Sequence, residues 1–400
     1  MTLAATQNDR PLLADVTLRE ATYALVTGDY VRAIRQAQQT RSLAVAINDR
    51  VMEAQAMHWW SRALWQQGKP QAAVPLLERA LKLAEHSNHW RTRALCLYDL
   101  SILAYYRDEY DEAIALLEKV IPLFEENGDK SHVTRCINML GLIEYARGNY
   151  EAALPHYQRS VELCQTIDWP YGEALMTGHL GNCYFALGDY RRCRELHERS
   201  LAISRLHNDL EAQSNSLDSI GLAYQFEGDL QAARLNYEAA LALAQELGNV
   251  RSQAYAATHL GLVLADLEEI EQAGDYLYEA IGQRQHVQAG QLAIDTQAAL
   301  AWLDLARGDG EFAADSAREV VAHLAENGVV GVELPLLVYW QCYTILKLAG
   351  SADEANTVLK AAYALLQEMA QRIQDETLRL GFLTNSPYHR QIVAAWENRL

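Results

Sequence analysis

The amino-acid sequence predicts an all-α fold built from consecutive helical hairpins. Ala, Leu, Glu, Gln and Arg, which all favour helices, dominate the 400 residues, whereas Val, Ile and Thr never cluster as alternating strands. Half of the residues are hydrophobic and only eight are proline, so the chain has enough apolar surface for a core. A third observation, an internal repeat with a period of 40 residues, sets the positions of the predicted helices.

The repeat is clearest in a seven-residue segment of the type Gly-Asp-Tyr or Gly-Asn-Tyr. Its copies are TGDYVRA at 27, QGKPQAA at 67, RDEYDEA at 107, RGNYEAA at 147, LGDYRRC at 187, EGDLQAA at 227, LEEIEQA at 267 and RGDGEFA at 307. A ninth copy, AGSADEA at 349, is displaced by two residues. The Gly is typical of a helix end, and the Asp or Asn after it can cap the next helix. We therefore expect a turn between two helices at each copy.

A second series marks the other turn of each hairpin. Residues that tolerate positive φ recur as Asn48, Asn88, Gly128, Asp168, Asn208, Gly248 and Gly328, and Gln288 alone interrupts them. Each period is thus predicted to hold two helices of about 16 to 18 residues.

A third series consists of small residues in the middle of the first helix: Ala21, Ser61, Ser101, Gly141, Gly181, Gly221, Gly261 and Ala301. Glycine inside a helix costs roughly 1 kcal/mol relative to alanine, so its recurrence at one phase indicates close helix packing. We expect the partner to be the small residue that recurs in the second helix as Ala33, Ala73, Ala113, Ala153, Cys193, Ala233, Ala273 and Ala313.

These residues resemble the tetratricopeptide repeat. The resemblance is carried by Leu180-Gly181, Tyr184, Gly188-Asp189-Tyr190 and the small residue at 193, and repeats near 134 and 214 match as well. The 40-residue period and Pro75 and Pro155 are similar to the longer repeats of kinesin light chains and bacterial signalling regulators. The resemblance covers about residues 13 to 365 and implies a right-handed α-solenoid of about nine hairpins.

The sequence predicts three parts: a frayed N-terminus (1–12), the repeat array (13–374) without an internal boundary, and a C-terminal cap (375–400). From Ser351 the last second helix is expected to run on through "GFL" at 381–383. A turn at "TNSP" and a closing helix from about Tyr388 follow. The apolar residues expected to cover the last repeat are Phe382, Leu383, Ile392, Val393 and Trp396.

Charge and composition argue against several classes of protein function. The net charge of −18 and the absence of a Lys/Arg stripe argue against nucleic acid binding; the acidity serves solubility or attracts a basic partner. No signal peptide or stretch of about 18 apolar residues is present, and the six cysteines form no Cys-x-x-Cys motif, so we expect a cytoplasmic protein with reduced thiols. The oligomeric state is left open.

No motif points to catalysis or to a cofactor. The chain has no Gly-x-Ser-x-Gly, no Gly-Lys-Ser/Thr and no His-Glu-x-x-His. The residues His179 and His259 share a repeat phase but lie two repeats apart, roughly 20 Å, too far to bind one metal ion. We expect no enzymatic activity, no metal and no cofactor.

The resemblance implies that one face of each first helix lines a binding groove. The candidate groove residues, taken from successive repeats, are His58, Arg62, Trp65, Tyr98, Tyr105, Asn138, Tyr145, His179, Asn182, Phe185, Asp218, Gln225, Thr258 and His259. Asn182 is similar to the family's groove asparagine, which binds the main chain of a ligand. The aromatic row at 65, 105, 145 and 185 can stack on a peptide or pack between neighbouring helices, and both interpretations stay open.

The sequence therefore predicts a non-catalytic scaffold that binds a protein or peptide segment. The partner is expected to be helical or extended and rich in Arg or Lys, because the groove margins are acidic. Chaperone C-terminal tails are disfavoured, since Arg62 is nearly the only basic groove residue. The alternative is an effector-sensing regulatory arm of a bacterial signalling ATPase or transcriptional regulator.

Overall fold

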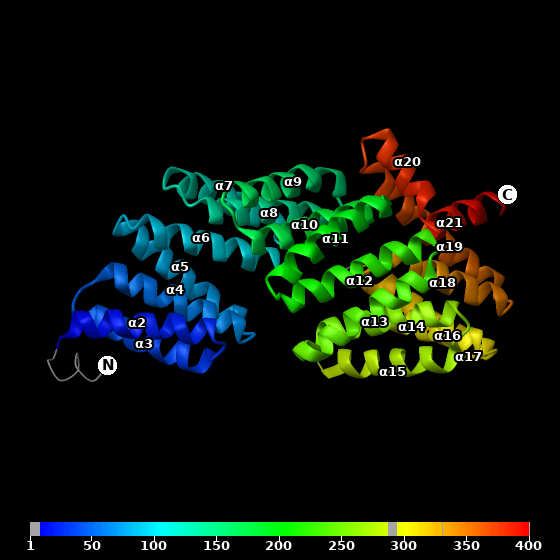
Figure 1. Ribbon diagram of the computed structural model, residues 1–400, viewed down its shortest axis with the longest axis horizontal. Helices are drawn as coiled ribbons and strands as arrows, with labels where there is room; N and C mark the ends of the chain where they lie inside the picture. Colours follow the sequence, from blue (N-terminus) through cyan, green and yellow to red (C-terminus); the bar gives the residue numbers. More distant parts are fainter. Residues whose placement is uncertain (1–8, 287–293, 330, 400) are drawn as a thin grey trace. The chain divides into compact units, whose positions relative to one another are not determined.

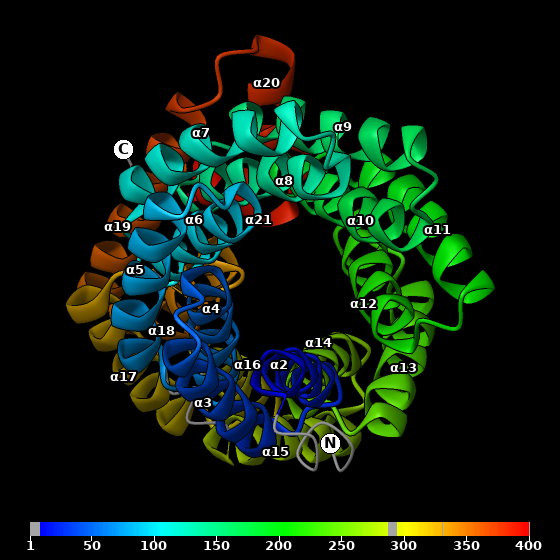
Figure 2. The ribbon, with the colours of Figure 1, turned by 90° about the vertical axis from the view of Figure 1, so that its left-hand side faces the viewer.

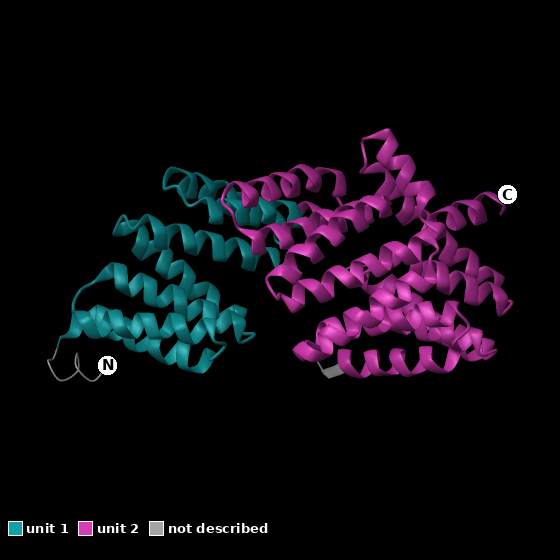
Figure 3. Cartoon of the chain, viewed as in Figure 1, with its two compact units in different colours: residues 1–143 teal, residues 144–400 magenta. Residues whose placement is uncertain are grey.

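The computed structural model describes residues 9–286, 294–329 and 331–399. It divides into two compact units, residues 1–143 and 144–400, and the boundary falls within helix α8 (Figure 3). The repeat phases continue across this boundary. Each unit is described by itself below.

The described residues form helices and no strands, which confirms the all-α prediction (Figure 1). In unit 1 the helices are α2 (Arg10–Val26), α3 (Tyr30–Ala46), α4 (Arg50–Gln66), α5 (Pro70–His86), α6 (Trp90–Tyr105), α7 (Tyr110–Glu126) and most of α8 (Lys130–Ala146). In unit 2 they are α9 (Tyr150–Thr166), α10 (Pro170–Ala186), α11 (Tyr190–Leu206), α12 (Leu210–Glu227), α13 (Leu230–Leu247), α14 (Val250–Asp266), α15 (Ile270–His286), α16 (Ile294–Ala306), α17 (Gly310–Asn327), α18 (Pro335–Leu348), α19 (Ala352–Gln371), α20 (Glu376–Asn385) and α21 (Pro387–Glu397). Of these helices, none is long and apolar enough to cross a membrane.

The turns lie where the 40-residue period places them. Asn48, Asn88 and Asn208 have φ between 52° and 56°, which confirms the predicted left-handed helix ends. Asp189 caps α11, because its side chain accepts a hydrogen bond from the Arg192 N–H at 3.1 Å. The predicted break in the series at Gln288 lies outside the described residues. The first helix begins at Arg10, three residues before the predicted start of the array at residue 13.

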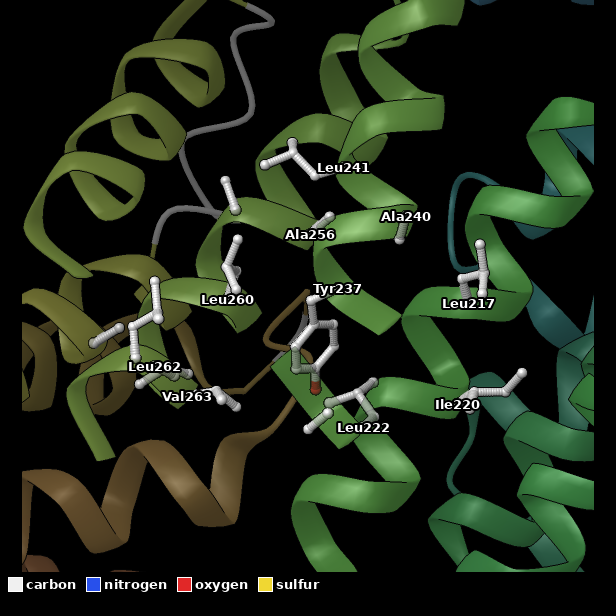
Figure 4. Close-up of a cluster of buried hydrophobic side chains, with 14 of the residues drawn as sticks. Leu217, Ile220, Leu222, Tyr237, Ala240, Leu241, Ala256, Leu260, Leu262 and Val263 are labelled. Carbon is white, nitrogen blue, oxygen red and sulfur yellow. The ribbon is translucent and has the colours of Figure 1, made fainter. Parts of the chain in front are cut away.

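The expected partner of the small residue in the first helix accounts for only part of the contact. A Cβ added at Gly181 would lie 3.4 Å from the Cys193 carbonyl oxygen and one at Gly261 would lie 3.2 Å from the Ala273 carbonyl oxygen, but the nearest atoms belong to a larger side chain. A Cβ added at Gly221 would lie 2.6 Å from the ring of Tyr237, and one at Gly181 would lie 2.6 Å from the ring of His197. The glycine therefore makes room for a large side chain four residues beyond the Ala233 or Cys193 position. Tyr237 is fully buried in this space, surrounded by aliphatic side chains (Figure 4).

In unit 2, first and second helices occupy different sides. Figure 2 shows α10, α12, α14 and α16 on the inner side of the stack and α11, α13, α15 and α17 on the outer side. The candidate groove phases of unit 2 lie on the inner helices. The connection between α17 and α18, residues 328–334, is longer than the turns between consecutive helices from α2 to α15, and α18 is shorter than the other first helices of this unit described in full. Together they explain why the last repeat is displaced in the sequence.

The single long C-terminal helix predicted from Ser351 is wrong. Helix α19 ends at Gln371, and a new helix, α20, begins after Asp375, whose carboxylate accepts the Leu378 N–H at 2.9 Å. Between them Ile373 is 1% exposed and anchors the break to the core. The closing helix α21 starts at Pro387, within one residue of the expected position.

The C-terminal helices contact two separate parts of unit 2. The Trp396 ring stacks on Tyr363 of α19 with centroids 4.7 Å apart, so α21 covers the last hairpin. The segment before it reaches earlier repeats: the Asn385 side chain donates to the Gly188 carbonyl at 3.0 Å, and the Tyr388 ring lies 5.4 Å from Phe226. The second set of contacts is not expected from the sequence.

Candidate functional site

The candidate groove residues of unit 1 are mostly buried or engaged with other side chains of this unit. His58 is 1% exposed, and its Nε2 lies 2.9 Å from an Asp99 carboxylate oxygen. Arg62 lies 3.5 Å from the same carboxylate. Tyr98 and Asn138 are also buried. These side chains hold neighbouring first helices together and leave little surface for a ligand.

The predicted aromatic row is largely engaged in packing. Each ring contacts another aromatic side chain: Trp65 with Tyr106 at 5.9 Å, Tyr105 with Tyr110 at 6.0 Å, Tyr145 with Tyr150 at 5.0 Å and Phe185 with Tyr190 at 5.3 Å, between centroids. At the same phase Gln225 is buried and accepts a hydrogen bond from the Tyr237 hydroxyl at 2.8 Å. Of the two interpretations of this row, these contacts favour packing.

Unit 2 contains a polar pocket of about 260 Å³ on its inner helices. We call it the polar pocket. It brings together three of the candidate residues, His179, Asn182 and Asp218, with side chains from α11 and α14 and with Glu333. Uncharged groups such as Asn215 and five serines make up much of the remaining wall. Among the described residues that line it, none is Lys or Arg.

Asn182 is an exposed side chain whose orientation is fixed. Its Oδ1 accepts hydrogen bonds from His197 Nε2 at 2.9 Å and from Ser219 Oγ at 3.3 Å. Within the described residues its Nδ2 group has no hydrogen-bond partner, so two N–H donors remain for a ligand.

The hydrogen bond from His197 fixes the orientation of the Asn182 amide. His197 is 3% exposed, and burial together with the nearby His179 lowers its pKa to about 3, so the ring is neutral. Because Nε2 donates to Asn182, Nδ1 carries no proton, and it has no partner among the described residues. Gly178 and Gly181 have no side chains, and this absence leaves room for the His197 ring next to α10. These two small residues therefore allow His197 to reach Asn182.

A buried ionic cluster lies next to the polar pocket. His259, 2% exposed, has Nδ1 3.0 Å from Asp218 Oδ1 and Nε2 3.3 Å from Glu333 Oε2. Burial alone would lower the pKa of His259, but the two carboxylates outweigh burial and hold the pKa well above 6.5. The protonated ring therefore donates to both acids at neutral pH.

Glu333 reaches the pocket from the connection between α17 and α18. The backbone N–H groups of Glu333 and Leu334 donate to the Asp295 carboxylate at 3.1 and 3.2 Å, which fixes the connection against α16. Burial, and secondarily the Glu333 charge, raise the pKa of Asp295 to about 6. Glu333 and Asp295 are absent from the candidates predicted from the sequence, because neither occupies a repeat position assigned to the groove.

One signal in the sequence could have located the buried pairs. His58 and Asp99 are 41 residues apart, and so are Asp218 and His259. A spacing of 41 residues, one period plus one residue, connects adjacent positions on two consecutive first helices. A similar spacing of 38 residues joins Thr258 to Thr296, whose hydroxyls lie 2.8 Å apart; Thr258 is buried and does not line the polar pocket.

A second cavity of about 90 Å³ adjoins the first; we call it the aromatic cavity. Phe185 and Tyr145 line it together with Phe226, Tyr388 and residues at the start of α18. Glu333 lines both this cavity and the polar pocket. The C-terminal segment thus completes a wall that the sequence did not predict.

The cysteines and acids do not form a reactive or metal-binding group. The six cysteines are buried and form no disulfide bond among the described residues, and the Cys183 thiol donates to the Tyr150 carbonyl at 3.0 Å. Burial raises the pKa of this thiol. In the ranges that the structure describes, no group of three or more His, Cys, Asp or Glu is placed to hold a metal ion.

One known family matches the chain in three segments, the first two of which overlap. The model for the tetratricopeptide repeat matches residues 52–126, 92–166 and 172–246. The chain contains tetratricopeptide repeats. The third segment includes most of α10 and all of α11 and α12, which supply most of the polar pocket, and the predicted tetratricopeptide repeats are confirmed over the matched residues.

Solved structures with this fold cover nearly the whole chain. The apo form of the quorum sensor NprR from B. thuringiensis is 16% identical with a TM-score of 0.63, over 88% of this chain and 98% of that chain. The Rap conjugation gene regulator of the plasmid pLS20, in complex with the Phr* peptide, is 12% identical with a TM-score of 0.61, over 92% and 99%. A signal transduction ATPase (STAND) protein with a tetratricopeptide repeat sensor, from Pyrococcus horikoshii, is 18% identical with a TM-score of 0.58, over 92% and 55%. Among curated proteins, none matches the chain at a significant level. At these identities the similarity establishes the fold.

Proposed function

We propose that the tetratricopeptide repeats of unit 2 form a non-catalytic peptide-binding module and that the polar pocket holds the ligand's main chain. The observation that carries this proposal is Asn182. Two donors hold its Oδ1, and its free Nδ2 can donate to a peptide carbonyl. Because the amide is already oriented, little conformational entropy is lost when the ligand binds.

The composition of the pocket supports a peptide over an anionic ligand. Its serines and Asn215 offer donors and acceptors that suit the alternating N–H and C=O groups of a main chain. Asp218 and Glu333 are the acidic residues of the described lining, and protonated His259 and, at Glu333, Arg251 and Arg284 offset part of their charge. Since no lysine or arginine belongs to the described lining itself, phosphate or carboxylate ligands are disfavoured. A neutral or basic peptide fits this lining best.

The comparisons are consistent with this function. One similar structure is described as a quorum sensor and another as a regulator in complex with a peptide. A second candidate, a sensor arm that regulates an attached ATPase, is favoured by one observation: this chain aligns over 92% of its length with only 55% of the STAND protein. That arrangement matches a repeat sensor within a longer signalling chain, and we propose it as the alternative.

Affinity selection tests the proposal. The purified chain is incubated with a library of acetylated, amidated heptapeptides, and bound peptides are identified by mass spectrometry. Gly178→Leu should abolish the selection, because Gly178 lines the pocket and a leucine there fills it. Gly178→Ala is the matched control: a Cβ at this position meets its nearest atom, His197 Cε1, at an ordinary 3.7 Å.

Asn182→Ala is a second variant for the same binding experiment. Loss of a hydrogen bond that is made in a desolvated site costs about 1–1.5 kcal/mol, so peptide affinity should fall about tenfold. If the wild type selects no peptide, or if Gly178→Leu and the wild type select the same peptides equally well, the polar pocket is not the binding site. A rise in melting temperature with a small effector in the absence of any peptide would support the sensor alternative.

A further inference from the structure

We propose that the aromatic cavity is a specificity subsite that takes one aliphatic side chain, Leu, Ile or Met, of the same peptide. This inference rests on the proposed function, since it concerns the peptide whose main chain Asn182 binds. Packing does not use all of the space beside the aromatic row. The rings of Tyr145 and Phe185 leave an open volume between them and the C-terminal segment, and the inference assigns a role to this volume.

The two cavities are close enough for one ligand. Asn182 and Phe185 lie three residues apart on α10, which is about 4.5 Å along the helix and on nearly the same face. Glu333 belongs to the walls of both cavities. An extended peptide advances about 3.3 Å per residue, so a residue one or two positions from the one bound to Asn182 reaches the aromatic cavity.

The walls of the cavity select for an uncharged side chain. Tyr145, Phe185, Phe226 and Met369 contribute apolar surface. Burial raises the pKa of Tyr145 and Tyr388 and lowers that of His389 to about 4, so these groups are neutral at physiological pH. A Lys, Arg, Asp or Glu side chain would lose its hydration here without gaining a partner of opposite charge, except at the Glu333 edge, where His259 already holds the carboxylate.

The volume selects for an aliphatic side chain. A cavity of about 150 Å³ admits benzene, whereas this one measures about 90 Å³. An isobutyl or thioether group fits that space, and an indole ring does not. The contacts of Asn385 with Gly188 and of Tyr388 with Phe226 hold the C-terminal wall in place, so the cavity exists before the peptide arrives.

The test uses a positional-scanning library of acetylated heptapeptides, each position fixed in turn as Leu, Met, Ala, Trp, Lys or Asp. For the wild type we expect one position at which Leu or Met is preferred over Ala by about tenfold or more, and over Lys, Asp and Trp by at least as much. The same library is applied to Ala186→Leu, which narrows the cavity from the end of α10.

Ala146→Leu, at the same repeat phase but outside the cavity, is the matched control. Ala186→Leu should remove the preference at that one position and leave the dependence on Asn182 intact. If peptides bind in an Asn182-dependent manner but no position prefers an aliphatic residue, the subsite is refuted while the proposed function stands. If the preference persists in Ala186→Leu, the subsite lies elsewhere and this inference is wrong. If no peptide binds to the wild type, both proposals fail.

Discussion

Replacing Glu333 with Gln should destabilise unit 2 through its contact with His259. Removing one partner of a buried ion pair costs about 3–5 kcal/mol. Two facts reduce this figure here: the Glu333 side chain retains 31% exposure, and His259 keeps Asp218 at 3.0 Å. We therefore expect the free energy of unfolding to fall by about 2 kcal/mol near pH 6.

The effect should depend on pH in a defined direction. The folded-state pKa of His259 lies well above 6.5, so the protonated ring stabilises the fold fully below about pH 6.5. This stabilisation is lost as the pH rises through the folded-state pKa. The pKa of Glu333 is lowered, because His259 and two arginines outweigh the effect of burial, so its own contribution is lost only as the solution becomes acidic. The coupling should thus be largest in weakly acidic to neutral solution and shrink in alkali.

A double-mutant cycle measures this coupling. Urea unfolding of the wild type, Glu333→Gln, His259→Gln and the double variant, from pH 6 to 10, separates the pair from the other ionisable groups. Glu326→Gln, an exposed position on α17, is the control and should change stability by less than about 0.5 kcal/mol. A coupling near zero at pH 6, or one that is as large at pH 10 as at pH 6, would refute the assignment of a protonated, doubly paired His259.

Three further predictions concern the packing, the caps and the C-terminal segment. Gly221→Ala should lower the free energy of unfolding by about 1–3 kcal/mol, because the new Cβ would lie 2.6 Å from the Tyr237 ring; urea titration that shows equal or greater stability would contradict it. Asp189→Ala should cost about 1 kcal/mol and Asp189→Asn much less, since the cap of α11 needs only a side-chain acceptor; equal losses in the same assay would count against the cap. Glu151→Gln should speed hydrogen exchange at the amides of residues 374 and 375, both of which donate to the Glu151 carboxylate, and unchanged exchange would show that this contact does not hold the segment.

The helical hairpins could be predicted from the sequence because their determinants are local. A left-handed residue such as Asn48 or Asn208 and a cap such as Asp189 act within a few residues, and each recurs with the 40-residue period. The phase of Asn182 follows from the same period, which is why an exposed pocket residue could be named in advance.

The rest of the site depends on contacts that the period does not describe. Glu333 lies in the irregular connection before α18, where no repeat phase applies, and only its meeting with His259 gives it a role. The break before α20 contains neither Gly nor Pro, so the buried Ile373 and the cap at Asp375 decide it. Burial of Gln225 and Thr258 could not be foreseen from their phase, because it depends on the partners Tyr237 and Thr296.

The most direct test of peptide binding by Asn182 is a crystal structure of the chain with a peptide chosen by the affinity selection. We predict that the peptide lies on the inner helices of unit 2 and that Asn182 Nδ2 donates to one of its main-chain carbonyl oxygens at about 2.9 Å. We also predict that an aliphatic side chain of the peptide enters the aromatic cavity beside Phe185. A peptide bound to the outer helices or to unit 1, with the polar pocket empty, would contradict the central claim.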